Sequence, residues 1–333
     1  MADPLVGSRS ALRVDFESSL GTVKGTPAPR LITFVSESLS GTQNLIRNPS
    51  IRADGNRPAP VNGNITASGQ LQVIADIDSI GWWLKLLNHA VASTGASDPY
   101  THTYKWDITS VTFRSAFIDL LQGTSRWKTM SGVRIKKFGV KFMSEGFMLV
   151  TLDLVGLTAA TTTSQTLTGT PTDWTASTPL HMLQIAAADL TIDGTASTSA
   201  GGNAACLAEL EIDPNVNITE NDYRIGQSGA RSGLAVGAMD LGVKLKLAVE
   251  GTTQYTFMQS TTSHDVTLKF TAAANRTLQM QIPAFYVQKT LPMVQNDMGI
   301  FVDIEGMAAY DATAATQLKW VLVNGNDSAT LYV

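Results

Sequence analysis

The feature that most restricts the fold is an alternation of apolar and polar side chains with a period of two residues. It is longest at 239–250, where every second residue from Met239 to Val249 is apolar and the intervening residues are mostly polar or charged. Shorter stretches of the same pattern occur at 148–154, 265–270 and 277–282. This period is that of a β-strand with one buried and one solvated face, as in antiparallel sheets. The sequence therefore predicts a mainly β protein built as antiparallel sandwiches or barrels.

One segment departs from this period and is typical of a helix. Between 78 and 89 the apolar residues recur at helical spacing, and Asp78 or Ser79 is a suitable N-cap. We therefore expect one short helix, in the first half of the chain. The second half shows no clear counterpart of the Trp82-Trp83 pair in this helix.

The chain also contains an internal repeat. A shift of 174 residues aligns two loops and the strands after them, with Ile51 on Ile225, Gly55 on Gly229, Arg57 on Arg231, Gly63 on Gly237 and Leu71 on Leu245. A shift of 150 residues aligns 151–159 with 301–309, including an Asp-x-x-Gly in each. Chance similarity between β-segments is the alternative, but it does not readily explain paired Gly-x-Arg and Asp-x-x-Gly motifs in the same order.

The repeat and a composition shift divide the chain. Residues 160–180 are rich in Thr and Ser, which is typical of a linker. The two shifts differ by 24 residues, so the first half contains extra sequence, which we place around the helix and the loop at 93–100. The predicted division is an N-terminal arm at 1–30, a first domain at 31–160, a linker at 161–182, a second domain at 183–325 and a C-terminal tail at 326–333.

Composition argues against several classes of function. The net charge of −4 does not suit a protein that grips nucleic-acid phosphates, and charged residues make up only 16% of the chain, fewer than the ~25% typical of soluble domains. Such a chain hides much of its surface in an assembly or has polar, uncharged loops. Cys206 is the only cysteine, the four histidines lack metal-site spacing, and no nucleotide-binding or nucleophile-elbow motif is present. We therefore predict that the protein is not an enzyme and binds no cofactor or metal. We also predict no membrane-spanning segment, because the sequence has no apolar stretch long enough to cross a membrane.

Two loops are candidate functional elements because the repeat matches them. Arg57 and Arg231 occupy equivalent places in them. In one interpretation each arginine only solvates a loop tip. In the other, each loop reaches a neighbouring subunit and its arginine pairs with a carboxylate there, which contributes specificity more dependably than affinity.

The order of motifs in the first half resembles that of the tail-tube (major tail) proteins of long-tailed bacteriophages. The resemblance rests on Asn48-Pro-Ser-Ile-Arg52, on Gly55-Asn-Arg57, on the strand at 63–73 with the helix after it, and on the strand that ends Asp153-Leu-Val-Gly156. It extends to the second half through the repeat. It implies a two-sheet β-fold with a flanking helix, whose subunits join edge to edge around a channel for DNA. Rings stack through long loops.

Carried over to this chain, the resemblance implies stacking loops at 49–62 and 223–236. The expected interface residues are Ile51, Arg52, Asp54, Arg57, Ile225 and Arg231. A family ring has six subunits of one domain each, so a duplicated chain implies a trimer with pseudo-sixfold symmetry. DNA would pass without specific binding, and tape-measure, tail-terminator and distal tail proteins are the expected partners. The expected location is the virion, after synthesis in the host cytoplasm.

Two other classes remain open at this stage. One is another virion β-protein, such as a decoration or capsid-associated subunit. The other is a carbohydrate-binding β-sandwich, which calcium ligands, exposed aromatic platforms or a secretion signal would favour. An enzyme with dispersed catalytic residues is the least favoured.

Overall fold

The computed structural model describes residues 9–107, 114–292 and 299–326, and this part of the chain is mainly β, as the alternation predicts. The strands and helix of the first half are β1 (Ala11–Phe16), β2 (Arg30–Ile32), β3 (Ser36–Glu37), β4 (Ser40–Ile46), β5 (Val61–Ile74), α1 (Ile80–Asn88), β6 (His89–Thr94), β7 (Tyr100–Trp106), β8 (Ala116–Gln122), β9 (Arg126–Phe142), β10 (Leu149–Gly156), β11 (Thr158–Thr162) and β12 (Thr172–Asp173). Two 3₁₀ turns follow, at Met182–Gln184 and Ala187–Asp189. The second half contains β13 (Leu190–Ile192), β14 (Thr195–Ala196), β15 (Leu207–Ile218), β16 (Val236–Ala248), α2 (Thr252–Met258), β17 (His264–Ala273), β18 (Arg276–Val287), β19 (Phe301–Ala308) and β20 (Lys319–Asn324).

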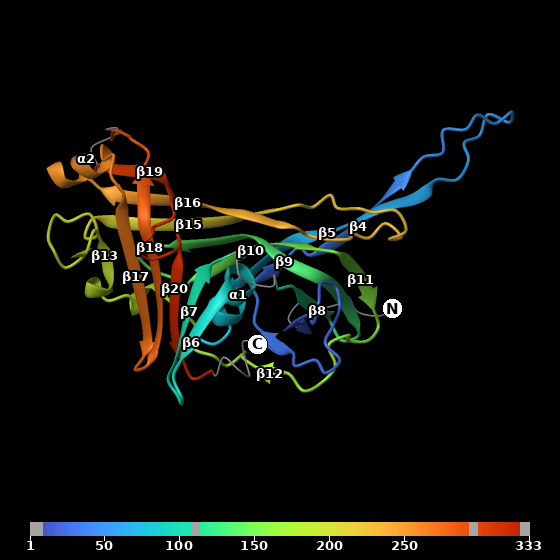
Figure 1. Cartoon of the computed structure of the whole chain (residues 1–333), viewed down its shortest axis with the longest axis horizontal. Helices are drawn as coiled ribbons and strands as arrows, with labels where there is room; N and C mark the ends of the chain where they lie inside the picture. Colours follow the sequence, from blue (N-terminus) through green and yellow to red (C-terminus); the bar gives the residue numbers. More distant parts are fainter. Residues whose placement is uncertain (1–8, 108–113, 293–298, 327–333) are drawn as a thin grey trace.

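One long antiparallel sheet joins the two halves. Its strand order is β4-β5-β10-β9-β15-β16-β19, and its strands run along the longest axis of the molecule (Figure 1). Along each of these strands, buried and solvated side chains alternate, so one face of the sheet is buried and the other faces solvent. The sheet does not close on itself, so within one chain the architecture is open and layered, without a closed barrel.

The strand pairings repeat between the halves. In the first half, β5 lies between β4 and β10, and β9 lies beside both β10 and β8. In the second half, β16 lies between β15 and β19, and β18 lies beside both β19 and β17. The unit β4-β5-β10-β9 therefore recurs as β15-β16-β19-β18. The repeat seen in the sequence is a repeat of strand order, which chance similarity does not explain.

The extra sequence of the first half is a hairpin. β6 and β7 follow α1 and lie where the sequence predicts the extra residues of the first half. The described strands of the second half include no counterpart of this hairpin. β7 pairs with β20, so this hairpin ties the first half to the end of the second.

The second half does contain a helix after its long strand, which the sequence did not predict. α2 follows β16 as α1 follows β5. It is short, and only Gln254, Phe257 and Met258 of it are buried. A seven-residue helix with two buried apolar side chains leaves too weak a periodic signal to be found, whereas α1 buries both tryptophans and four aliphatic residues.

Residues 9–30, the described part of the predicted N-terminal arm, are not an extended arm. β1 pairs with β2 and β8, and Leu12, Val14 and Phe16 are buried in the core, where Phe16 stacks on Trp82 with ring centroids 4.7 Å apart. The glycines and prolines that suggested an arm mostly lie after this strand, in the turns that lead to β2.

The predicted linker is packed against the first half. Leu167, Trp174 and Leu180 are buried, and β12 forms a short parallel pairing with β2. A Thr- and Ser-rich composition therefore does not make this segment a free tether, because three spaced apolar side chains anchor it. The domain boundaries themselves stay a prediction, and the predicted tail at 326–333 lies outside the described residues except for Asn326.

Candidate assembly surfaces

The solvated face of the long sheet is covered by charged residues in cross-strand rows. One row runs through Lys141 of β9, Glu211 of β15, Lys244 of β16 and Glu305 of β19, which are register partners in turn. The signs alternate along the row, so each charge lies opposite its complement. Over the whole face, however, seven acidic residues exceed four lysines. The acidic residues are Asp153, Glu209, Glu211, Asp213, Asp240, Asp303 and Glu305, and the lysines are Lys137, Lys141, Lys244 and Lys246.

Ion pairs on this face are strongest where the two halves meet. At the β9–β15 junction, Lys137 Nζ lies 2.6 Å from an Asp213 carboxylate oxygen and Lys141 Nζ lies 2.8 Å from that of Glu209. The hydrogen bond that Lys137 donates to Asp213 raises the pKa of Lys137, and the hydrogen bond that Lys141 donates to Glu209 lowers the pKa of Glu209. All four side chains are partly solvated, so each pair contributes little to stability but defines which strands belong together.

The hairpin of β4 and β5 projects far from the rest of the molecule (Figure 1). From Gly63, which the second loop approaches at Gly229, to the turn at Gly55 is eight residues, which span at most roughly 27 Å when fully extended. Every residue of β4 is exposed. The projecting hairpin, residues 40–62, is called the arm below.

Apolar side chains on the arm have no cover within the chain. Ile51 at its tip is 99% exposed, and Leu45, Ile46 and Val61 along its stem are each more than half exposed. Leu45 and Ile46 are adjacent, so they face opposite sides of the strand. This break in the two-residue alternation is the sequence signal that marks the stem as a strand with apolar side chains on both faces, and the sequence-based list omitted these residues.

The tip of the arm is held by local contacts. Arg52 and Asp54 form a two-point ion pair, with the Arg52 Nη2 to Asp54 Oδ2 distance at 2.7 Å, and Arg52 lowers the pKa of that carboxyl. Gly55 has a φ of +71°, and its N–H donates to the Arg52 carbonyl. These contacts preshape the turn and leave Ile51 and Arg57 exposed, and no described contact engages Arg57.

The second loop, 223–236, is folded back onto the first half and does not project. The Gly229 carbonyl accepts a hydrogen bond from the Ile65 N–H at 2.8 Å, and the Tyr223 hydroxyl donates to the Ile65 carbonyl at 2.9 Å. Gly229 lies so close that an added Cβ would meet the Gly63 carbonyl oxygen at 2.7 Å. The two loops aligned by the repeat therefore differ in their surroundings.

Arg231 is an internal residue, which corrects the expectation that it pairs with a carboxylate of a neighbour. It is 4% exposed, and its guanidinium donates to the carbonyls of Glu220 at 2.7 Å, Ala67 at 3.0 Å and Gly156 at 2.8 Å. Ala67 and Gly156 are register partners in β5 and β10. Arg231 thus fastens the second loop to the first half, a role that the matched Arg57 does not share.

The six residues predicted for the interface therefore separate into three groups. The arm tip brings together Ile51, Arg52, Asp54 and Arg57. Ile225 is fully exposed on the second loop, so both loops present an uncovered isoleucine at matched positions. Arg231 alone is withdrawn from the surface.

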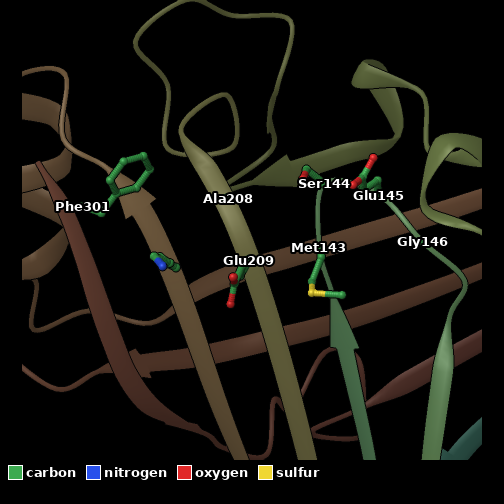
Figure 2. Close-up of a pocket in the computed structure, with 8 residues that line it drawn as sticks. Met143, Ser144, Glu145, Gly146, Ala208, Glu209 and Phe301 are labelled. Carbon is green, nitrogen blue, oxygen red and sulfur yellow. The ribbon is translucent and has the colours of Figure 1, made fainter. Parts of the chain in front are cut away.

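A groove lies at the end of the sheet opposite the arm. It encloses about 720 Å³ between the end of β9, the start of β15 and the start of β19, and Figure 2 shows Met143, Glu145, Glu209 and Phe301 around it. Met143 and Phe301 are 43% and 50% exposed. Apolar side chains beside carboxylates suit a ligand with an aliphatic group next to a cation.

The family model described as phage tail tube protein matches residues 7–317. The chain belongs to the phage tail tube protein family. It is a structural component of a virion, and its family is one of structural proteins. Among solved structures, a chain of the anti-feeding prophage baseplate, from a six-fold symmetrised cryo-electron-microscopy structure, aligns at 14% identity and a TM-score of 0.33. That alignment covers 49% of this tail tube protein and 97% of the baseplate chain. A search of curated proteins returned no match.

Two searches of the described residues bear on other kinds of site. Neither of the helices described is long and apolar enough to cross a bilayer. In residues 9–107, 114–292 and 299–326, no group of three or more His, Cys, Asp or Glu residues is placed to hold a metal ion.

Proposed function

We propose that three copies of this tail tube protein close into a ring with pseudo-sixfold symmetry, and that the rings stack into a tube through which DNA passes. The observation that carries this proposal is the repeated unit β4-β5-β10-β9 and β15-β16-β19-β18. The chain joins the two units through β9 and β15, and among the described residues the outer strand β4 pairs with β5 and has an open outer edge. Open edges invite pairing with another chain, and a closed ring satisfies them without unlimited growth.

The arm supports the stacking part of the proposal. The arm projects from the rest of the molecule and its tip residue Ile51 is 99% exposed, so the described part of the chain does not cover it. The groove at the opposite end of the sheet is the surface that the next ring would present to it. Met143 and Phe301 would take the isoleucine, and Glu145 would face an arginine of the tip.

The solvated face of the sheet suits the wall of a channel. Its acidic excess would repel DNA phosphates over a Debye length of about 8–10 Å, so DNA would slide without binding. The tape-measure protein inside the channel, and terminator and distal tail proteins at its two ends, are the partners this model expects. Synthesis in the host cytoplasm would precede assembly.

Electron microscopy and sedimentation of the purified protein test this function. We expect stacked rings with three chains each, against isolated particles for a decoration protein and monomers for a carbohydrate-binding module. A protein that stays monomeric at high concentration, or rings with a chain number other than three, would contradict the proposal.

A further inference from the structure

The root of the arm is a kink in an otherwise continuous strand. β3 and β4 both pair with β5, and the register does not change between them, since Glu37 lies opposite Leu71 and Ser40 lies opposite Ser68. No residue is therefore inserted between the sheet and the arm. Residues 38–39, between the two strands, depart from the ladder without shifting it, so the direction of the arm is determined there.

The backbone at this kink is turned out of the ladder. The Ser38 N–H donates to the Gln70 carbonyl at 2.8 Å, but the Gln70 N–H donates to the Ser38 hydroxyl at 3.0 Å, where a regular antiparallel pair would use the carbonyl. The Ser38 carbonyl lies close to Gly69 of β5 instead. A Cβ added to Gly69 would meet that carbonyl oxygen at 2.5 Å and the Leu39 Cα at 2.6 Å. A glycine in β5 is thus what leaves room for the kink.

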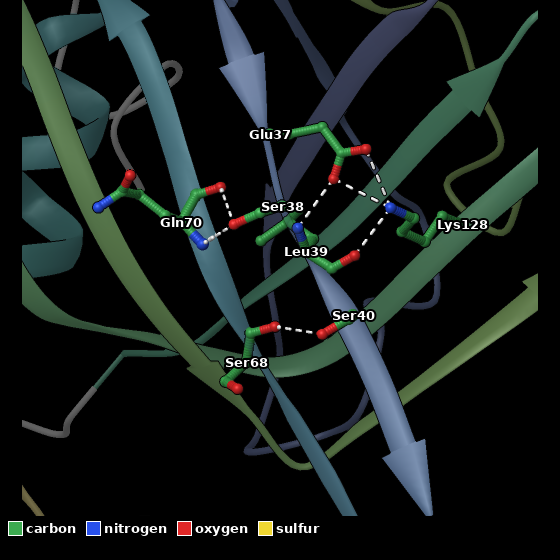
Figure 3. A network of polar contacts seen from close by, with 7 residues as sticks. All are labelled: Glu37, Ser38, Leu39, Ser40, Ser68, Gln70 and Lys128. Carbon is green, nitrogen blue, oxygen red and sulfur yellow. Dashed lines mark hydrogen bonds and ion pairs between the residues drawn. The ribbon is translucent and has the colours of Figure 1, made fainter.

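The side chains of Glu37 and Lys128, called the clamp below, bridge the kink (Figure 3). Lys128 Nζ lies 2.9 and 3.0 Å from the two Glu37 carboxylate oxygens and 2.7 Å from the Leu39 carbonyl oxygen. The Leu39 N–H donates to the same carboxylate at 2.8 Å. Glu37 lies before the kink, and Leu39 directly precedes the first residue of the arm. The clamp therefore holds both backbone polar groups of the residue from which the arm departs.

The clamp is more buried than the ion pairs on the solvated face of the long sheet. The side chains of Lys128 and Glu37 are 21% and 17% exposed, against 42% and 32% for Lys137 and Asp213. Leu39 itself is buried. Hydrogen bonds between charged groups are stronger in such surroundings and are less screened by salt. The clamp can therefore fix a backbone direction, which the exposed pairs do not.

The clamp and a close contact act on the same side of the arm. Lys128 belongs to β9, and Ala159 belongs to β11, which pairs with β9 in that region. A Cβ added to Gly41 would meet the Ala159 Cβ at 2.7 Å, so the first residues of the arm cannot move closer to β11. The clamp opposes the reverse movement, because it ties Leu39 to β9. Together they define one direction for the arm.

We propose that Glu37 and Lys128 are positioning residues of the arm, and that they hold it in the unassembled chain in the direction in which the next ring receives it. This role rests on the stacking function proposed above and adds to it how the arm is aimed before it binds. An arm that already points in its bound direction loses less conformational freedom on stacking, so tubes form at a lower protein concentration.

Distances between two spin labels test the positioning in unassembled protein. Ala53→Cys at the arm tip and Ala176→Cys on the body place the labels at exposed residues, and Cys206 is buried and should stay unlabelled. Pulsed electron paramagnetic resonance should give a narrow distance distribution for this pair. Lys128→Met should widen it roughly twofold, because a two-stranded hairpin without tertiary support is only marginally stable in water.

Two further variants separate positioning from a loss of stability. Lys128→Met leaves the Glu37 carboxylate without its cation, which destabilises the fold, whereas Glu37→Gln/Lys128→Met leaves no unpaired charge and should widen the distribution equally. The matched control is Lys141→Met, which removes another ion pair of β9, with Glu209 at 2.8 Å, and should leave the distribution unchanged. Urea unfolding of each labelled variant establishes that the measured chains are folded.

Tube formation gives the second measurement. The protein concentration at which tubes appear should rise roughly fivefold or more in Lys128→Met and in Glu37→Gln/Lys128→Met. Equally narrow distributions with and without the clamp would overturn the positioning role and leave the stacking function standing. A wider distribution with an unchanged concentration for tube formation would also overturn it, because the direction of the arm would then not matter for assembly. Absence of tubes from the unmodified protein would overturn the proposed function itself.

Discussion

Replacement of Arg231 distinguishes an internal fastening residue from an interface residue. The change is Arg231→Met, which keeps an unbranched apolar stem and removes the guanidinium. It leaves the buried carbonyls of Glu220, Ala67 and Gly156 without their donor. The matched control is Arg57→Met on the arm, where the side chain is exposed.

The magnitude follows from the three bonds. A hydrogen bond to a charged group contributes about 1.5–3 kcal/mol, and a buried carbonyl without a partner costs a similar amount. The three bonds share one side chain and water can reach part of the gap, so they do not add fully. We expect Arg231→Met to lower the free energy of unfolding by about 3–5 kcal/mol, and Arg57→Met to change it by less than about 0.5 kcal/mol.

Urea unfolding followed by circular dichroism measures the global effect, at a concentration where the protein is unassembled. Hydrogen exchange at Ile65 measures the local one, because its N–H donates to Gly229 of the fastened loop. Arg231→Lys should recover only part of the loss, since one ammonium cannot replace the fixed geometry of Nε and Nη1. Equal stability of the Arg231 and Arg57 variants, with unchanged exchange at Ile65, would refute the reasoning.

Three further predictions concern other residues. Ile51→Asp should shorten tubes at least tenfold in electron micrographs while the unfolding free energy stays within about 0.5 kcal/mol, because the Ile51 side chain is 99% exposed. Long tubes from this variant would exclude the arm tip from stacking. Gly229→Val should cost about 2–3 kcal/mol in urea unfolding, since φ is +82° and the Cβ would collide with the Gly63 carbonyl, whereas Gly25→Val, with open space around it, should be nearly neutral. Burial lowers the pKa of Lys85 to about 7, helped by Arg114 and Lys24, so between pH 7 and 10 the unfolded chain binds more protons and stability rises with pH. That rise from pH 7 to 9 should be about 2 kcal/mol smaller in Lys85→Met, and identical pH profiles would contradict the buried lysine.

The strands were predictable because one face of each is buried. The alternation at 239–250 is β16, and the shorter runs fall in β10, β17 and β18. The repeat was equally visible, because glycines and apolar residues at strand ends must recur where the backbone geometry recurs. Even the place of the inserted hairpin followed from the difference between the two shifts.

Other features depend on partners far away in the chain, which a local pattern does not reveal. Nothing in the sequence near Arg231 shows that the carbonyls of Ala67 and Gly156 lie beside it. Its match with Arg57 even suggested the opposite role. β1 and the segment at 161–182 were misjudged for a related reason: their glycine, proline or threonine content describes the turns, whereas a few apolar side chains decide whether the segment packs.

In the proposed ring, the junction of β9 and β15 inside one chain must not be exchanged for a junction with a neighbouring copy. If β15 exchanged with β4 of a neighbour, the Lys137–Asp213 and Lys141–Glu209 pairs would be lost, since β4 offers only uncharged residues there. Exposed pairs of this kind contribute only about 0.2–1 kcal/mol each, which is too little to prevent exchange alone. Arg231 adds the larger part by fastening the β15–β16 loop to β5 and β10. The chain thus commits β15 to its own β9, so in the proposed ring closure with whole chains is favoured over strand exchange.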